Sequence, residues 1–336
     1  MPLRSTLPSA SISGREEHRQ RRQTELARVF GGEIGALLAE HDTTEVLINP
    51  DGQMYVDRMY AGMKPVGQRF HPDDVMNAIM TVAGELRVTI DDEHPWLQGE
   101  LPLDGSRLQA WIPPLVQSPT LVIRKHRRQG VDGVPILRIE DYISDGSMPE
   151  TFADHFRSAV RDRVNVLIVG STSSGKTTFG GAFLNLITEL CPNDRIITIE
   201  DTFELHCSSS NRVSLRESPH ASMRLLLQQS LRARPDRIIF GEVRNEAAHD
   251  LVMAWNTGHN GGFCTTHANG IADAMNRLET LVELAGYPLA PRRIANAVQI
   301  VVNMKRASSG ARRVDEFAYV RGWKNGEYLL ESVSPH

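Results

Sequence analysis

The sequence predicts an α/β protein of two domains, a smaller α/β domain followed by a larger domain built on a mostly parallel sheet. Across residues 164–267, apolar strand-like runs alternate with helix-like stretches, which is typical of parallel strands joined by crossover helices. Residues 129–150 are dense in Gly, Pro and Asp and separate this part from an earlier region of different texture. A chain of 336 residues is long enough for two hydrophobic cores.

In the first domain, which we expect to span residues 15–128, helices and strands are predicted in a mixed order. A helical period over residues 15–40 follows a Ser- and Pro-rich tail, residues 1–14, which we expect to be disordered. Residues 43–58 predict a hairpin turned at Asn49-Pro50-Asp51-Gly52, residues 71–86 a helix, and residues 97–124 further strands.

The second domain is expected to span residues 151–336, after a linker of residues 129–150. Its tail predicts an antiparallel hairpin turned at Asn325-Gly326. Its body predicts five strands and three helices in alternation, the strands at residues 164–170, 195–200, 212–215, 237–242 and 261–267 and the helices at 176–190, 220–232 and 245–255.

Composition excludes several classes of protein. A net charge of −4 argues against direct nucleic-acid binding over a generally basic surface. Cys191, Cys207 and Cys264 form no CxxC pair, so neither a disulfide framework nor a zinc site is indicated, and a reducing cytoplasm fits. No apolar run approaches the ~20 residues that span a bilayer, and the N-terminus lacks the apolar core of a signal peptide. If the protein works at a membrane, we expect peripheral association.

A phosphate-binding loop follows the strand at residues 164–170. The glycines let the backbone N–H groups face the phosphates, the next helix adds its positive end, and Lys176 reaches the β and γ oxygens of ATP. Thr177 would bind Mg²⁺. The expected nucleotide-binding residues are Gly170, Ser171, Thr172, Ser173, Ser174, Gly175, Lys176, Thr177 and Thr178.

Two strands end in carboxylates that could serve hydrolysis. RIITIEDTFEL carries Glu200, with Asp201 and Glu204 close behind, and RIIFGEVR carries Glu242 before Arg244. In a parallel sheet both acids reach the edge where ligands bind, where they could hold Mg²⁺ or position a water. The alternative is that they are solvated loop acids or helix caps.

Two histidines flank the strand GGFCTTH. His267 at its end is placed to touch a γ-phosphate or the attacking water. For His259 a structural role is as good an interpretation. With only Cys264 between them, the pair lacks a third ligand for zinc.

Four stretches in this order, GSTSSGKTT, ITIEDTFEL, RIIFGEVR and GHNGGFCTTHANG, resemble the secretion "traffic" ATPases that power type IV secretion, conjugation, type II secretion and type IV pili. In the first domain INPDGQMYVDR, GSRLQAWIPP and LVIRK are similar to the TrbB-like conjugal-transfer branch. The resemblance therefore covers nearly the whole chain. The Gly-Glu of RIIFGEVR stands where a Walker B motif usually has an aspartate, a departure that this family shares.

The resemblance implies a RecA-like second domain and a homohexameric ring, with ATP and Mg²⁺ between the two domains of each subunit. Arg107 and Arg124 match the family's phosphate-contacting arginines of the first domain, and guanidinium groups suit that role. Glu200 is expected to polarise the attacking water and Glu242 to lie on the metal side, although the two roles could be exchanged. Expected partners are inner-membrane components of a secretion or conjugation apparatus, at the cytoplasmic face of the membrane.

Two other classes remain open from the sequence. A RecA-like helicase or recombinase would need a basic, aromatic groove, and the one dense basic run, residues 15–22, reads as a solvated helix face. A small-molecule kinase would share the phosphate loop, but a separate domain carrying phosphate-directed arginines argues against it. Within the resembled superfamily, a pilus or type II secretion ATPase is a further alternative.

Overall fold

The structure is a computed structural model, and the chain divides into two compact units, residues 1–127 and 128–336. Within the expected first helix, only its last part is described, and the expected disordered tail lies outside the described residues. The structure describes residues 31–59, 61–101, 104–126, 129–130, 134–218, 220–288, 290–307 and 311–335.

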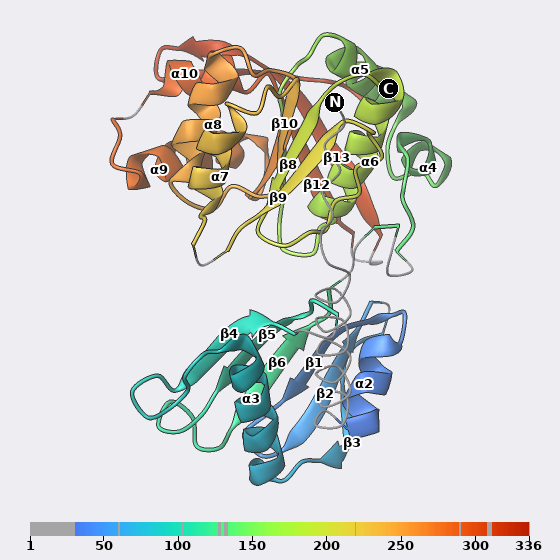
Figure 1. The fold of residues 1–336 in the computed structure, drawn as a ribbon. Coiled ribbons are helices and arrows are strands. Elements are labelled where there is room, and N and C mark those ends of the chain that lie inside the picture. The colour runs from blue at the N-terminus through green and yellow to red at the C-terminus, as the bar shows by residue number, and fades with distance from the viewer. Residues whose placement is uncertain are drawn as a thin grey trace, which may run out of the picture. The chain divides into compact units, whose positions relative to one another are not determined.

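The described part of the first unit is a six-stranded antiparallel sheet with two helices on one face (Figure 1). The strand order is β3-β2-β1-β6-β5-β4. The strands are β1 (Thr43–Ile48), β2 (Gln53–Arg58), β3 (Gly62–Arg69), β4 (Trp96–Glu100), β5 (Arg107–Trp111) and β6 (Thr120–Arg124), and the helices are α2 (Gly31–Ala39) and α3 (Pro72–Leu86).

Alternation of side chains builds the core of this unit. Val46 and Ile48 on β1 and Val56 on β2 are buried against α2 and α3, as a period of two requires. Helix α3 begins after His71, whose Nδ1 accepts the N–H of Asp73, with Pro72 in the first turn. The hairpin, the helix and the further strands predicted between residues 43 and 124 are therefore confirmed.

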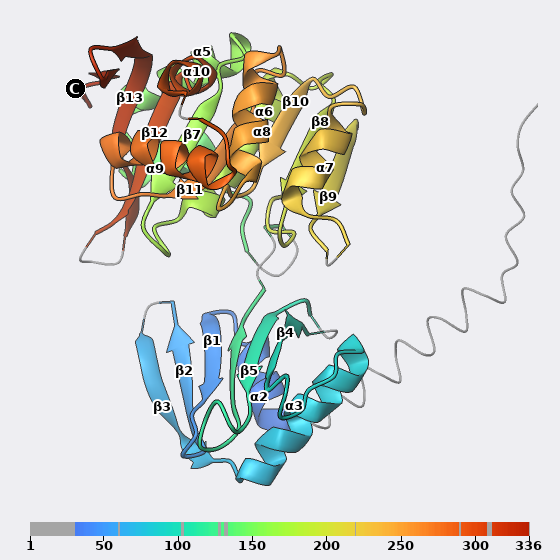
Figure 2. The ribbon, with the colours of Figure 1, turned by 90° about the vertical axis from the view of Figure 1, so that its left-hand side faces the viewer.

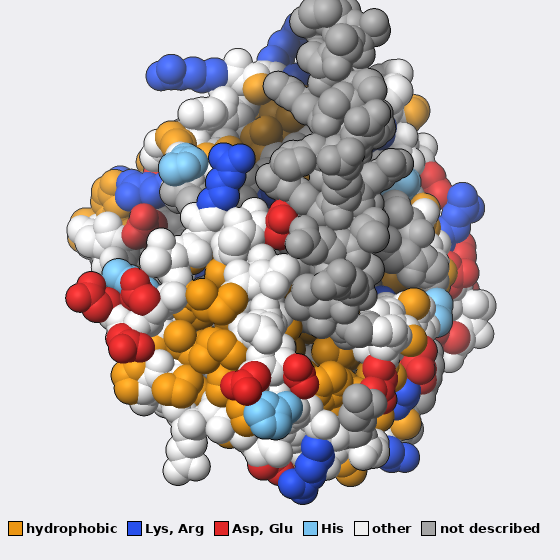
Figure 3. Space-filling model, turned by 60° about the horizontal axis from the view of Figure 1, so that its bottom comes forward, with side chains coloured by type: hydrophobic (Ala, Val, Ile, Leu, Met, Phe, Trp, Pro, Cys, Tyr) orange, Lys and Arg blue, Asp and Glu red, His pale blue; other side chains and the backbone are white. Residues whose placement is uncertain are grey.

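The surface of the first unit is not uniformly polar. Met63, Trp96 and Leu115 are exposed there. Figure 3 shows a face on which hydrophobic side chains gather in patches among Asp and Glu, with Lys and Arg mainly toward its margins.

The second unit is an eight-stranded sheet in the order β14-β13-β12-β7-β11-β10-β8-β9. Six neighbouring strands, from β12 to β9, run parallel, and the C-terminal hairpin adds two antiparallel strands at one edge (Figure 2). The strands are β7 (Val166–Gly170), β8 (Ile196–Glu200), β9 (Arg212–Arg216), β10 (Arg237–Phe240), β11 (Phe263–His267), β12 (Ile300–Arg306), β13 (Arg312–Lys324) and β14 (Glu327–Ser332).

Helices cover both faces of this sheet, so the central strands are apolar on both sides. All five residues of β7 are buried. One face packs against α4 (Ile139–Ser144), α5 (Glu150–Arg161) and α6 (Lys176–Leu190). The other packs against α7 (Met223–Ser230), α8 (Ala247–Asn256), α9 (Ile271–Leu284) and α10 (Pro291–Ala297).

The predicted mostly parallel sheet and its five strands are confirmed, as is the tail hairpin, whose Asn325 and Gly326 both have positive φ. The prediction did not include α5, α9, α10 or β12. Residues 139–144, expected within the linker, form α4, whose Tyr142 packs edge-on against Phe179 of α6. Among the described residues no helix is both long and apolar enough to cross a membrane.

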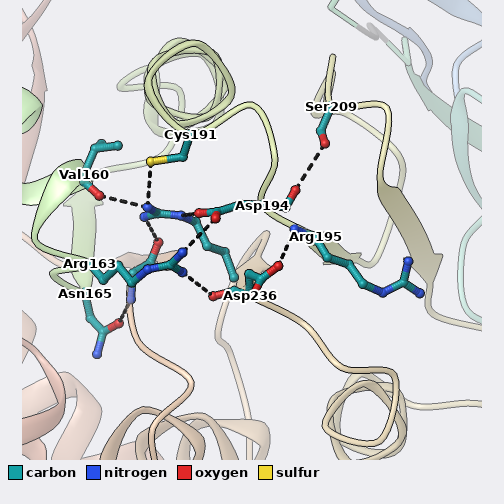
Figure 4. Close-up of polar contacts among 10 residues, drawn as sticks. Val160, Arg163, Asn165, Cys191, Asp194, Arg195, Ser209 and Asp236 are labelled. Atoms are coloured by element: carbon teal, nitrogen blue, oxygen red, sulfur yellow. Dashed lines mark hydrogen bonds and ion pairs between the residues drawn. The ribbon is translucent and has the colours of Figure 1, made fainter.

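A buried ion-pair cluster joins the amino ends of the parallel strands (Figure 4). The side chain of Arg237, at the start of β10, is 1% exposed. Its Nε donates to Asp194 Oδ2 at 2.7 Å, and Arg163 donates to the other oxygen of Asp194 at 2.7 Å. The remaining Arg237 nitrogens donate to the carbonyl oxygens of Gly261 and Val160 and to Cys191 Sγ. The cluster is fully paired, as a buried charge requires.

Candidate functional site

The loop between β7 and α6 has the geometry of an anion cradle. Gly175, with φ +95°, caps α6, and no side chain caps the first N–H groups of that helix. Ser173 also has a positive φ of 60°. The hydroxyl of Ser174 is buried without a hydrogen-bond partner, whereas the side chains of Ser171 and Thr172 are exposed. The loop therefore presents unpaired donors at a helix N-terminus, where anions bind.

Lys176, in the first turn of α6, is buried with its ammonium group inside this loop. Its Nζ donates to the carbonyl oxygens of Gly170 at 2.9 Å and Ser171 at 3.0 Å, and it lies 3.1 Å from His267 Nδ1. Burial lowers the pKa of Lys176, and the charge of Glu242 opposes that shift. Thr177 and Thr178 follow in the same turn and are partly buried.

His267 joins Lys176 to Glu242. The Nε2 of the ring is 2.9 Å from Glu242 Oε1, although the angle leaves that oxygen without a hydrogen bond. Burial lowers the pKa of His267, the charge of Glu242 opposes that shift, and Lys176 and Arg244 add to it. A neutral ring with its proton on Nε2 accepts from Lys176 at Nδ1 and faces Glu242 with its N–H.

Arg244 holds the other side of the acidic group. Its Nη2 donates to Glu242 Oε2 at 2.5 Å and its Nη1 to Asp201 Oδ2 at 3.0 Å. The hydrogen bond from Arg244 to Glu242 raises the pKa of the guanidinium. These contacts join five side chains in series, each touching the next, and we call this series the edge network. Its members, in order, are Lys176, His267, Glu242, Arg244 and Asp201.

Glu200 lies at the end of β8, beside the edge network, and is 2% exposed. Its Oε1 accepts the N–H groups of Glu204 and Leu205 at 3.0 and 2.9 Å. The other oxygen, Oε2, is buried without a hydrogen-bond partner. Burial raises the pKa of Glu200 to about 7, against the two backbone hydrogen bonds. A carboxyl with such a pKa can accept a proton near neutral pH.

The parallel register explains why these residues meet. His267 pairs with Gly170 across β11 and β7, and Phe240 pairs with Ile199 across β10 and β8. All four strands therefore end together at one edge of the sheet, where parallel sheets bind ligands. His259 precedes β11 and lies toward the opposite edge, which favours the structural interpretation of that residue.

Arg107 and Arg124 lie in the first unit, on neighbouring strands. They are directly paired across β5 and β6, so both side chains leave the same face of the sheet. Glu45 pairs with Arg124 on the other side, 3.7 Å from its Nε, and Glu100 pairs with Arg107. The two arginines thus occupy the centre of an acid-flanked row.

One residue at the loop had no signal in the sequence. Arg312, at the start of β13, donates from Nε to the carbonyl oxygen of Ser173 at 3.2 Å, although 139 residues separate them. A Cβ at Gly175 would lie 2.8 Å from Arg312 Cδ, so the arginine stem covers the loop at that glycine. Only the pairing of β12 with both β7 and β13 brings this residue to the site.

The arrangement suits a phosphate chain and an attacking water. The cradle and Lys176 supply donors for phosphate oxygens, and Glu200 and Glu242 supply carboxylates at its border. Within the described part of the chain, no three His, Cys, Asp or Glu side chains gather as a metal centre of their own. A cation at this site would be coordinated partly by protein side chains and partly by phosphate oxygens, as Mg²⁺ ordinarily is.

The sequence matches the family described as "Type II/IV secretion system protein" over residues 34–319. It is 37% identical over 307 residues to a probable conjugal transfer protein TrbB of Sinorhizobium fredii, covering 91% of this chain and 92% of the relative. It is 33% identical over 302 residues to the protein VirB11 of Agrobacterium fabrum, covering 77% and 84%.

Among solved structures, the fold is similar to that of the pilus retraction motor PilT with bound ADP. The TM-score is 0.59 at 19% sequence identity, over 90% of this chain and 83% of that one. At this identity the likeness concerns the fold alone, and it extends over both units.

Proposed function

Because the chain belongs to the type II/IV secretion ATPase family, as a type IV secretion and conjugation ATPase of the TrbB and VirB11 type, we propose that it is an Mg²⁺-dependent ATPase that acts as a homohexameric ring. The observation that carries the proposal is the edge network, in which Lys176 of the phosphate loop is joined through His267 to Glu242. Nucleotide binding and hydrolysis at this edge would drive assembly of, or transfer through, a conjugation apparatus.

Residues 170–178 would hold the phosphates of ATP. The unpartnered hydroxyl of Ser174 and the open N–H groups of α6 fit this role. Thr177 and Glu242 would hold Mg²⁺, partly through water. When bound, the ion neutralises charge on the β- and γ-phosphates. Both oxygens of Glu242 face His267 or Arg244, so one of these contacts must be exchanged.

Glu200 would polarise the attacking water. Its Oε1 is held by two backbone N–H groups, which fixes the carboxyl, while its unpartnered Oε2 can accept from a water. The pKa of about 7 poises it as a base at neutral pH. His267, already in contact with Lys176 and Glu242, would orient the water or a γ-phosphate oxygen.

Arg107 and Arg124 would add cationic donors to the phosphates. Their pairing on adjacent strands supports a shared role, because both guanidinium groups leave one face of the sheet. Each can offer bidentate hydrogen bonds to phosphate oxygens. Domain closure on ATP and release after hydrolysis would then couple the chemistry to motion.

We further propose peripheral attachment to the cytoplasmic face of the inner membrane, through membrane components of the secretion or conjugation apparatus. We propose a conjugation apparatus because the similar TrbB of Sinorhizobium fredii is described as a probable conjugal transfer protein.

The test combines phosphate release with light scattering, with and without ATP and Mg²⁺. We expect a ring of about six subunits and hydrolysis that Lys176→Ala abolishes and EDTA removes. Lys324→Ala, on the exposed end of β13, is the matched control and should behave as the unmodified protein. Hydrolysis by a monomer only when single-stranded DNA is present would instead indicate a nucleic-acid motor, and phosphate transfer to an acceptor other than water a kinase.

A further inference from the structure

The side chain of Gln129 is buried against the helix that carries Lys176, although this residue stands at the entrance to the second unit. It is 4% exposed, and it is the second residue of the second unit. Its Nε2 donates to the carbonyl oxygens of Thr177 at 3.4 Å and Thr178 at 3.3 Å. These carbonyls belong to the first turn of α6, next to the phosphate loop.

A glycine in α6 makes room for this amide. A Cβ at Gly181 would lie 1.9 Å from Gln129 Oε1 and 2.4 Å from Nε2. Glycine inside a helix is less favourable than alanine by about 1 kcal/mol, so its presence within a 15-residue helix is explained by the side chain that lies over it. The amide orientation is also defined, because the reverse orientation would set Oε1 against the carbonyl oxygens of the first turn.

The backbone of Gln129 contacts the loop that follows Glu200. Its N–H donates to the carbonyl oxygen of Glu204 at 3.4 Å. Glu204 and its neighbour Leu205 in turn donate their N–H groups to Glu200 Oε1. Gln129 therefore contacts both the helix that positions Lys176 and the loop that positions Glu200.

We propose that Gln129 is a positioning residue that fixes the first turn of α6 relative to residues 201–205. A displacement of the chain where it enters the second unit is then transmitted to Lys176 and Glu200 together. Gln129 would act through α6 and residues 201–205, not as a group that reacts with the nucleotide. This inference rests on the proposed ATPase function, since it assigns a role within that site.

The first experiment removes the amide and keeps its volume. In the full-length protein, Gln129→Met should retain its thermal unfolding temperature within a few degrees, because the space beside Gly181 stays filled. We expect kcat to fall about tenfold, which corresponds to about 1.4 kcal/mol in the activation free energy, and the pH midpoint of kcat to move. Unchanged kcat and pH midpoint would overturn the proposal.

The second experiment separates positioning from packing. Gly181→Ala should displace the amide and lower both the unfolding temperature and kcat. Adding Gln129→Ala to Gly181→Ala removes the clash, so the unfolding temperature should recover while kcat stays low. Recovery of kcat together with the unfolding temperature would show that Gln129 only fills space, and would overturn the proposal.

A binding measurement keeps the two proposals distinguishable. Affinity for a fluorescent ATP analogue reports on the phosphate loop without hydrolysis. If the unmodified protein released no phosphate, the proposed function would fail, yet Gln129→Met should still bind the analogue several-fold more weakly. Equal affinities of Gln129→Met and the unmodified protein would then overturn the positioning role itself.

Discussion

The two ends of the same parallel strands carry two charged clusters that differ in how completely they are paired. At the amino end, every side-chain nitrogen of Arg237 has a partner and the side chain is 1% exposed. At the carboxyl end, Arg244 is 51% exposed, and buried oxygens of Ser174 and Glu200 have no hydrogen-bond partner. We infer that the fully paired cluster has a structural role, whereas the incompletely paired one is the site proposed to receive a ligand.

The largest effect should come from the carboxyl end. Lys176→Ala should lower the rate of phosphate release by about 10²–10³-fold or more, because it removes the charge that meets the phosphates. It should leave the unfolding temperature unchanged or raised, because burial already lowers the pKa of Lys176 and so disfavours its charge. Phosphate release and thermal unfolding measured on the same sample check this. A large fall in both the rate and the unfolding temperature would mean that the carboxyl-end cluster is as structural as the amino-end cluster.

The opposite pattern is expected at the amino end. Arg237→Met should lower the free energy of unfolding by about 3–5 kcal/mol, since it leaves Asp194 in the protein interior with one partner fewer. The kcat of the folded protein should not change. Arg163→Met is the matched control, because Arg163 pairs with the same carboxylate while 44% exposed, and it should lose about 1 kcal/mol or less. Equal losses of unfolding free energy in both variants would mean that burial of the arginine does not determine how much its ion pair stabilises the protein.

Glu200, at the carboxyl end, should make the free energy of unfolding depend on pH. Its pKa is raised from 4.5 to about 7, so the folded protein binds this proton more tightly than the unfolded chain. The resulting stability is complete below pH 4.5 and is lost as pH rises through 7. Glu200→Gln should therefore be more stable than the unmodified protein at pH 8, by up to about 3 kcal/mol, with a smaller difference at pH 5.

Denaturant unfolding at several pH values measures this difference, and kcat should meanwhile fall at every pH. Glu327→Gln, on an exposed position of β14, should show no such pH dependence. A pH-independent effect of Glu200→Gln on stability would argue against a raised pKa and against Glu200 as the base.

The smallest effect should come from Arg312. Arg312→Ala removes the hydrogen bond to Ser173 and should weaken ATP binding about five- to tenfold, in line with about 1 kcal/mol for one hydrogen bond to a loop carbonyl. Arg313→Ala, next on the strand and paired with Asp315, should not change ATP affinity. Calorimetry or fluorescence titration distinguishes the two, and equal effects would point to net charge alone.

Local patterns in the sequence were enough to predict what depends on neighbouring residues. The strand before Gly170, the glycine-framed loop and α6 follow from one continuous stretch, and so does the hairpin turn at Asn325-Gly326. The prediction that Glu200, Glu242 and His267 lie at one edge also needed only the rule that parallel strands end together.

Contacts between distant segments could not be predicted in this way. Arg312 reaches the phosphate loop through strand pairing, and Gln129 reaches α6 through a space left by Gly181. Arg237 reads in the sequence as an ordinary charged residue at the start of a strand, and its burial depends on Asp194, Gly261 and Val160, which come from three other segments. No period or spacing encodes such partners.

The position of β7 has a consequence for how the protein is made. The strand that leads into the phosphate loop lies between β11 and β12, and its second neighbour begins only at Ile300. During synthesis, β7 therefore keeps an unpaired edge until most of the chain has been translated. We expect the nucleotide site to be among the last parts to form. Binding of ATP would then stabilise chains that include Ile300 and the residues after it, but not shorter ones.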